Sequence, residues 1–122
     1  MRMSLGSLTL ILVAVTLSAV AQIAFKFGVS SDPGQWARAL PGPLAKLVTP
    51  GVLIGLALYG LGTLIWLAAL GRVELSQAYP FVGIGFLLTT LAGWWLFGDQ
   101  ISAQRVTGIV LVAVGIVLVA RS

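Results

Sequence analysis

Four long apolar segments dominate the pattern of hydrophobic and polar positions along the chain. They cover residues 5–25, 51–70, 78–97 and 101–120 and are interrupted mainly by Gly, Ser and Thr. A membrane-spanning helix needs about 20 predominantly apolar residues. Because backbone polar groups in lipid must be bonded within the segment, each apolar segment is predicted to be a transmembrane helix. The pattern predicts an all-α membrane protein with one four-helix transmembrane domain over residues 1–122.

The connections between these segments differ in length. Residues 71–77 and 98–105 form short links, which make the last three helices antiparallel neighbours. Residues 27–50 form a longer loop that contains several prolines and an apolar face at helical spacing. This loop is expected either to lie in the lipid headgroup layer or to be a solvated loop held by one Trp. The apolar face comprises Trp36, Leu40, Leu44 and Leu47.

Composition agrees with a membrane protein and narrows the function. Of the 122 residues, 59% are hydrophobic and 8% are charged, whereas a soluble domain has about a quarter of its residues charged. No room remains for a soluble catalytic domain, so we expect no enzyme activity. The net charge of +4 lies beside apolar segments, which indicates anionic membrane lipids as partners and not nucleic acid. The absence of Cys and His removes thiol and imidazole chemistry, so no metal or cofactor is expected.

Basic residues do not fix the orientation of the chain in the membrane. The two predicted sides carry nearly equal numbers of them, so the positive-inside rule gives no clear direction. Either other signals decide the orientation, or the protein tolerates both orientations and pairs antiparallel. One side has Arg2, Arg72 and Arg121, and the other has Lys26, Arg38, Lys46 and Arg105.

The first segment also has features of a signal peptide. Arg2 precedes an apolar run that ends in the small residues Ala19-Val20-Ala21, which is the pattern of a cleavage site. Lys26 then closes the segment in the way a snorkelling base closes a membrane helix. We expect the segment to be retained as the first helix.

Polar side chains inside the segments indicate a substrate pathway. Ser18, Gln22 and Lys26 are spaced by four residues and therefore share one face of the first helix. An amide is costly in lipid, so Gln22 should face another helix or a watery cavity. The alternative role of this face is hydrogen bonding between helices, worth about 1 kcal/mol. The predicted pathway comprises Ser18, Gln22, Lys26, Tyr59, Thr63 and Tyr79.

Two pairs of glycines have predicted mechanical roles. Gly83 and Gly85 make a thin point in the third helix, where it is expected to bend between states. Gly108 and Gly115 are seven residues apart and share one face of the fourth helix. That face is predicted to pack closely against another helix across a dimer.

The acidic residues lie away from the middle of every segment. Asp32, Glu74 and Asp99 all fall in loops or at segment ends. Proton-coupled transporters commonly need a membrane-embedded carboxylate whose pKa is raised by burial. This placement argues against proton-coupled export of cations. Basic groups at the interface, Lys26 and Arg105 among them, suit an anionic headgroup better.

The order and spacing of these features resemble a known family. The four-segment plan, Gly83-Ile84-Gly85 and the run from Gly108 to Gly115 look like the small multidrug resistance group within the drug/metabolite transporter superfamily. Three stretches are closer to one branch, the four-span EamA-like proteins that include subunits of the aminoarabinose-phosphoundecaprenol flippase. These stretches are Val20 to Lys26, Ala78-Tyr79-Pro80 and Phe97-Gly98-Asp99.

The resemblance implies a flippase that moves a lipid-linked sugar phosphate, or a similar amphipathic anionic lipid, across the bacterial inner (cytoplasmic) membrane. It also implies a homodimer, or a heterodimer with a paralogous four-span subunit. The drug-exporting members carry a Glu at the position of Ser18 when the segments are aligned on Lys26, and this departure argues against proton-driven drug export. Two alternatives stay open: a proton-coupled exporter of small cationic drugs or metabolites, and a non-transporting accessory subunit of a membrane complex.

Overall fold

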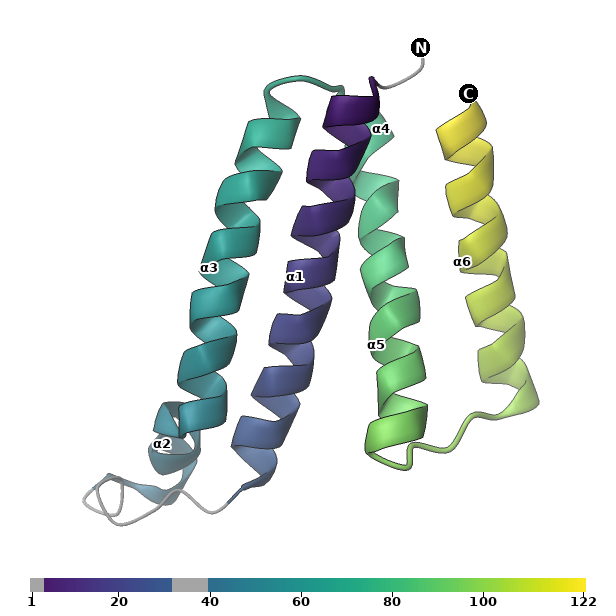
Figure 1. Ribbon diagram of the computed structural model, residues 1–122. Coiled ribbons are helices and arrows are strands. Elements are labelled where there is room, and N and C mark those ends of the chain that lie inside the picture. Colours follow the sequence, from purple (N-terminus) through teal and green to yellow (C-terminus); the bar gives the residue numbers. More distant parts are fainter. Residues whose placement is uncertain (1–3, 32–39) are drawn as a thin grey trace.

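The computed structural model describes residues 4–31 and 40–122, which form four long helices joined by short turns (Figure 1). The long helices are α1 (Leu5–Ser30), α3 (Pro50–Leu70), α5 (Val82–Leu96) and α6 (Ala103–Arg121). The short elements are the helices α2 (Gly42–Ala45) and α4 (Leu75–Ala78) and the 3₁₀ turns η2 (Lys46–Val48) and η3 (Tyr79–Phe81). Four stretches are long and apolar enough to cross a membrane, with Leu75–Leu96 counted as one. The predicted all-α, four-helix architecture is confirmed.

α1 is the central helix of the molecule. It packs along α3 on one side and against α5 on the other, and α6 lies beyond α5 at the edge (Figure 1). The start of α1, the α3–α4 link and the C-terminus lie at one end of the bundle, as the sequence predicted (Figure 1). None of the residues of α6 is fully buried. The outermost helix is therefore the one with the least protein around it.

Side-chain caps fix where three of the helices begin. The Ser4 hydroxyl accepts a hydrogen bond from the Ser7 amide at 3.1 Å, and Ser102 does the same for the Arg105 amide at 3.1 Å. Thr49 caps α3, where Pro50 at the first position needs no hydrogen-bond partner for its nitrogen. Each cap satisfies an amide that the helix itself leaves unpaired.

The third membrane-spanning stretch begins earlier than the sequence predicted. It starts at Leu75, not at residue 78, and passes through the 3₁₀ turn η3 before α5. Pro80 lies in this turn. Its ring lacks an N–H and would clash with the carbonyl four residues earlier in a regular α-helix. The tighter turn carries the chain past this proline without ending the span.

The contact between α1 and α3 is built from small residues. A methyl group added at Gly51 would lie 2.7 Å from the Cα of Gly28 and 3.0 Å from the carbonyl oxygen of Ala24. One added at Gly62 would lie 3.2 Å from the carbonyl oxygen of Ala14. These distances are shorter than ordinary van der Waals contact, so the two backbones reach their separation only because side chains are missing.

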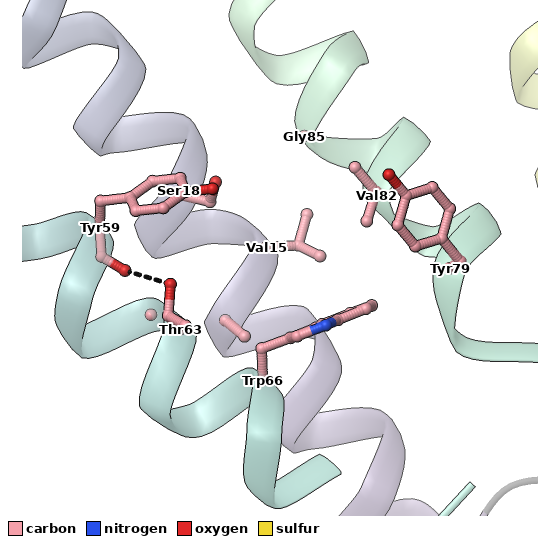
Figure 2. Close-up of a pocket in the computed structure, with 10 residues that line it drawn as sticks. Val15, Ser18, Tyr59, Thr63, Trp66, Tyr79, Val82 and Gly85 are labelled. Carbon is pink, nitrogen blue, oxygen red and sulfur yellow. Dashed lines mark hydrogen bonds between the residues drawn. The ribbon is translucent and has the colours of Figure 1, made fainter. Parts of the chain in front are cut away.

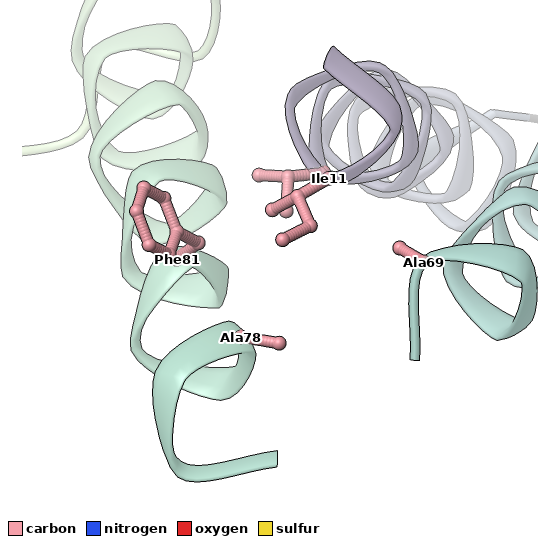
Figure 3. Close-up of a cluster of buried hydrophobic side chains, with 5 residues drawn as sticks. Ile11, Ala69, Ala78 and Phe81 are labelled. Carbon is pink, nitrogen blue, oxygen red and sulfur yellow. The ribbon is translucent and has the colours of Figure 1, made fainter. Parts of the chain in front are cut away.

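A cluster of buried side chains joins three spans near the end of the bundle that holds the termini (Figure 3). Ile11 of α1 is fully buried, and it points between Ala69 of α3 and the turn that contains Ala78 and Phe81. Val15 completes the cluster one turn further along α1. This packing holds the start of the third span against the central helix.

The described part of the long connection is partly packed and partly exposed. Ala45 and Thr49 are buried, whereas Leu40, Leu44 and Leu47 are exposed. An exposed apolar face agrees with a position in the headgroup layer, which stays a prediction. Four residues named in the sequence analysis lie outside the described residues: Arg2, Asp32, Trp36 and Arg38.

Gly51→Ala should destabilise the protein by about 1–3 kcal/mol, because the new methyl group meets the backbone of α1 and overpacks the contact. Gly60→Ala is the matched control on the same helix, since a methyl group there meets nothing within 4 Å. The measurement is unfolding of both variants in mixed detergent micelles, followed by tryptophan fluorescence. Equal stability of the two variants would contradict the close contact of α1 and α3.

Candidate substrate cleft

A cavity of about 200 Å³ lies between α1, α3 and the third span (Figure 2). α1 supplies its back wall, α3 contributes one flank, and the start of the third span contributes the other. Small side chains on α1 and α3 leave the space open. The lining residues are Ala14, Val15, Ser18, Tyr59, Gly62, Thr63, Trp66, Tyr79, Val82 and Gly85.

The polar groups of the cavity are hydroxyls and one indole N–H. Ser18 is half-buried on α1, and Tyr59 and Tyr79 are 45% and 61% exposed on opposite flanks. The Thr63 hydroxyl donates a hydrogen bond to the Tyr59 carbonyl oxygen at 2.8 Å (Figure 2). The lone pairs of the Thr63 oxygen still point outward and can accept a bond from a ligand.

The cavity lining is electrically neutral. Its ten residues include no Asp, Glu, Lys or Arg. Trp66 extends from α3 into the cavity and presents both an apolar ring and an N–H donor (Figure 2). Across the described ranges 4–31 and 40–122, no group of three or more His, Cys, Asp and Glu residues is placed to hold a metal ion. Such a cavity can hydrogen-bond a polar neutral group and pack against an apolar one.

Four of the six predicted pathway residues meet at this cavity. They are Ser18, Tyr59, Thr63 and Tyr79, contributed by three different spans. Gln22 and Lys26 do not line it. Both are exposed on α1, one and two turns further toward Ser30. The predicted polar face of α1 therefore begins in the cavity and continues along the outer surface of the helix.

The predicted glycines contact different surroundings. Gly85 borders the cavity, where an added methyl group would lie 3.3 Å from Val15 of α1. Gly83 faces α6, and a methyl group there would lie 2.8 Å from Ile116. A methyl group added at Gly108 or at Gly115 on α6 would meet no other atom within 4 Å. The second pair is thus available to a neighbouring molecule.

Sequence reasoning missed several residues of the cavity wall. Trp66 shares a helix face with Tyr59 and Thr63 at spacings of four and three, so its periodicity carried a usable signal. Gly62 lies next to Thr63 and makes room for α1. Val15 lies three residues before Ser18 and shares its face of α1, so spacing indicated its position. Ala14 and Val82 are ordinary apolar residues in apolar helices, and nothing in the sequence distinguishes them from residues that face lipid.

Comparisons with known proteins place the chain among membrane transporters. The family model of the Small Multidrug Resistance protein matches residues 45–112. A probable 4-amino-4-deoxy-L-arabinose-phosphoundecaprenol flippase subunit ArnE from Pseudomonas savastanoi pv. phaseolicola is 36% identical over 112 residues, which cover 92% of this chain and 95% of that protein. A protein of the same description from Pseudomonas aeruginosa strain UCBPP-PA14 is 34% identical over 95% of this chain and 98% of its own length. No solved structure matches.

The family match and the fold agree. The matched residues cover more than half of the chain and include all of α3, the complete third span and the first half of α6. The two relatives extend the similarity through α1. The chain is therefore a multi-pass membrane protein that belongs to the Small Multidrug Resistance family.

Proposed function

We propose that this protein is a subunit of a flippase in the bacterial inner membrane. Its substrate is a sugar linked to a polyprenyl phosphate, or a similar amphipathic anionic lipid. The relatives from Pseudomonas are described as probable subunits of a flippase for such a lipid-linked amino sugar. The protein acts by transport and not by enzymatic catalysis, because its polar groups hydrogen-bond a passing headgroup and change no covalent bond.

The neutral, hydroxyl-lined cavity is the observation that carries this proposal. A sugar has several hydroxyl groups that exchange hydrogen bonds with Ser18, Thr63 and the tyrosines without any charge being buried. A lipophilic cation would instead need a carboxylate within the membrane as its counter-charge. Glu74 and Asp99, the described acids, lie at the ends of spans. The cavity therefore fits a sugar better than a cationic drug.

The route of the phosphate follows the outer face of α1. Gln22 and Lys26 continue from Ser18 toward the end of the helix, and Lys26 meets the phosphate where the route opens at the membrane surface. In this mechanism the headgroup crosses along the polar face, while the polyprenyl tail stays in the bilayer. Gly83 and Gly85 let the third span bend as access passes from one side to the other.

A second subunit completes the pathway in this proposal. Gln22 is exposed on the single chain, and an exposed amide in the hydrocarbon region is costly unless another helix or a wet cleft covers it. α6 offers a packing surface, because Gly108 and Gly115 are open and its large apolar residues are exposed. The partner is a second copy or a paralogous four-span subunit.

Two other functions compete with this proposal. The family description names multidrug resistance, which favours proton-coupled export of small cations. The relatives are described as subunits, which agrees with an accessory role that needs a partner for transport. The first alternative requires cation transport driven by a proton gradient, and the second requires that the purified protein alone moves no lipid.

Gln22→Ala and Lys26→Gln should slow the translocation of a polyprenyl-phosphate-linked sugar in reconstituted vesicles. Loss of a hydrogen bond to a charged group at Lys26 should raise the lipid concentration for half-maximal rate about tenfold. Lys26→Arg keeps the charge and should restore most of the rate. The measurement is enzymatic or chemical labelling of the lipid headgroup that reaches the outer leaflet, with and without a proton gradient.

Thr16→Ala is the control for these variants. Thr16 is also on α1, but it is exposed away from the cavity lining, and its hydroxyl bonds the Leu12 carbonyl oxygen at 2.7 Å. This variant should transport at the normal rate. If both Gln22→Ala and Lys26→Gln also transport normally, the assigned pathway is wrong. Transport of a quaternary ammonium probe in place of the lipid would support the exporter.

Subunit packing through α6 should be visible by disulfide cross-linking in native membranes. The chain has no Cys, so any disulfide between two copies of a single-Cys variant must form at the substituted position. Leu111→Cys lies on the glycine face near the middle of α6, where partners of either orientation meet, and it should cross-link. Leu64→Cys on α3 is the matched control, because Leu64 and Leu111 are both 66% exposed. It should stay monomeric.

Bulky side chains at the glycine positions should abolish this cross-link. Gly108→Leu or Gly115→Leu in the Leu111→Cys background would hold the partner helix away from the new thiol. Mass analysis of the cross-linked species identifies the partner as a second copy or a paralogue. Packing through this face would be excluded if Leu64→Cys and Leu111→Cys cross-linked equally. It would also be excluded if Gly108→Leu and Gly115→Leu left the Leu111→Cys cross-link unchanged.

A further inference from the structure

A second cleft lies between α5 and α6 and runs from the middle of α5 to the α5–α6 link, at the end of the bundle opposite the C-terminus. Its volume is about 320 Å³, which falls within the range of about 300–1,000 Å³ that is usual for small-molecule sites. It shares no residue with the cavity described above. Its lining residues are Phe86, Thr89, Thr90, Asp99, Ile101 and Arg105.

This cleft contains one acid and one base, in contrast to the neutral cavity. Asp99 comes from the α5–α6 link, and Arg105 comes from the first turn of α6. A guanidinium binds phosphate through parallel N–H bonds, and a carboxylate binds a primary ammonium. The pair therefore matches a ligand that carries both a phosphate and an amine. A purely anionic headgroup would be repelled by Asp99.

The backbone around the α5–α6 link places Asp99 over the end of α5. Gly98 has a φ of +69°, a left-handed conformation that favours glycine, and it turns the chain back. The Asp99 amide then donates to the Gly93 carbonyl oxygen at 3.0 Å. The Asp99 carboxylate lies so close to Gly93 that a methyl group there would collide with it. Gly93 therefore makes the room that the carboxylate occupies.

Arg105 is positioned by the same link. Its Nη1 donates to the Gln100 carbonyl oxygen at 2.7 Å, which holds the guanidinium beside the cleft. The guanidinium fork has other N–H donors that can reach a phosphate. Thr89 and Thr90 donate to the Phe86 carbonyl oxygen at 3.0 and 2.8 Å, so their oxygens present lone pairs to a ligand. These lone pairs can accept from an ammonium or a sugar hydroxyl.

We propose that the cleft between α5 and α6 binds a headgroup that carries both a phosphate and a primary amine, with Arg105 on the phosphate and Asp99 on the ammonium. An amino-sugar phosphate and the ethanolamine headgroup of a bulk phospholipid share this chemistry. The role of the cleft as the site that receives the transported headgroup rests on the proposed function. The binding of a phosphate and an amine by Arg105 and Asp99 does not depend on that function.

The test measures binding to the full-length protein in nanodiscs of phosphatidylcholine, a lipid without a primary amine. The probes are 4-amino-4-deoxyarabinose 1-phosphate and arabinose 1-phosphate, which differ only by an amine in place of a hydroxyl. The protein should bind the amino probe about tenfold more tightly. Asp99→Asn should bind both probes equally, because it loses the contact with the ammonium and no longer repels arabinose 1-phosphate, which should bind at least as tightly as before. Arg105→Gln should weaken both about tenfold.

Variants at the other end of the bundle control for a general effect of charge. Glu74→Gln and Arg72→Gln remove an exposed acid and base there and should change neither affinity. Asp99→Glu should keep the preference for the amine, which separates a charge contact from a folding defect. The proposal is overturned if the protein binds both probes equally, or if Asp99→Asn still prefers the amino probe. It is also overturned if Glu74→Gln or Arg72→Gln loses the preference for the amino probe.

A second arm identifies the source of the ligand. In nanodiscs of phosphatidylethanolamine, a weaker apparent affinity for the amino probe means that the bulk lipid occupies the cleft. An unchanged affinity assigns the cleft to amino-sugar phosphates. Failure of this proposal differs from failure of the proposed function. A protein that translocates lipid but does not discriminate between the probes refutes only the cleft, and one that discriminates without translocating refutes only the flippase.

Discussion

The close approach of α1 and α3 is the constraint on which the rest of the structure depends. In lipid there is no hydrophobic driving force between helices, so they associate by van der Waals packing where small residues let the backbones meet. Gly28, Gly51 and Gly62 supply these positions. The contact fixes α1 as the central helix, and α1 in turn carries Ser18 into the cavity and Ile11 into the buried cluster.

The two clefts differ in their chemistry. The cavity between α1, α3 and the third span is neutral and lined by hydroxyls, as suits a site inside the hydrocarbon region where charge is costly. The cleft between α5 and α6 carries Asp99 and Arg105, which are both exposed and lie at the α5–α6 link and the first turn of α6. A headgroup that meets charges at the surface and hydroxyls within would shed its water in stages.

Much of the candidate site could be predicted from the sequence, because polar residues are rare in apolar helices. Ser18, Tyr59, Thr63 and Tyr79 were predicted as a pathway and line one cavity. Gln22 shares a face with Ser18, but the face is longer than the cavity, and spacing alone does not tell where a cavity ends. The charged cleft was missed because Asp99 comes from a link and Arg105 from the start of a helix. The link folds back so that Asp99 lies against Gly93, and this fold leaves no periodic pattern in the sequence.

The sequence by itself determined the four spans, their order and the sides on which the links fall, because the bilayer requires about 20 apolar residues and internal backbone bonding wherever the chain crosses. Only the tertiary structure decided which faces meet. These helices are apolar on all sides, so no hydrophobic stripe distinguishes a face toward protein from a face toward lipid. The missing side chains of Gly51 and Gly62 mark the contact, whereas Gly60 on the same helix is open, and the difference appears only when α1 is in place.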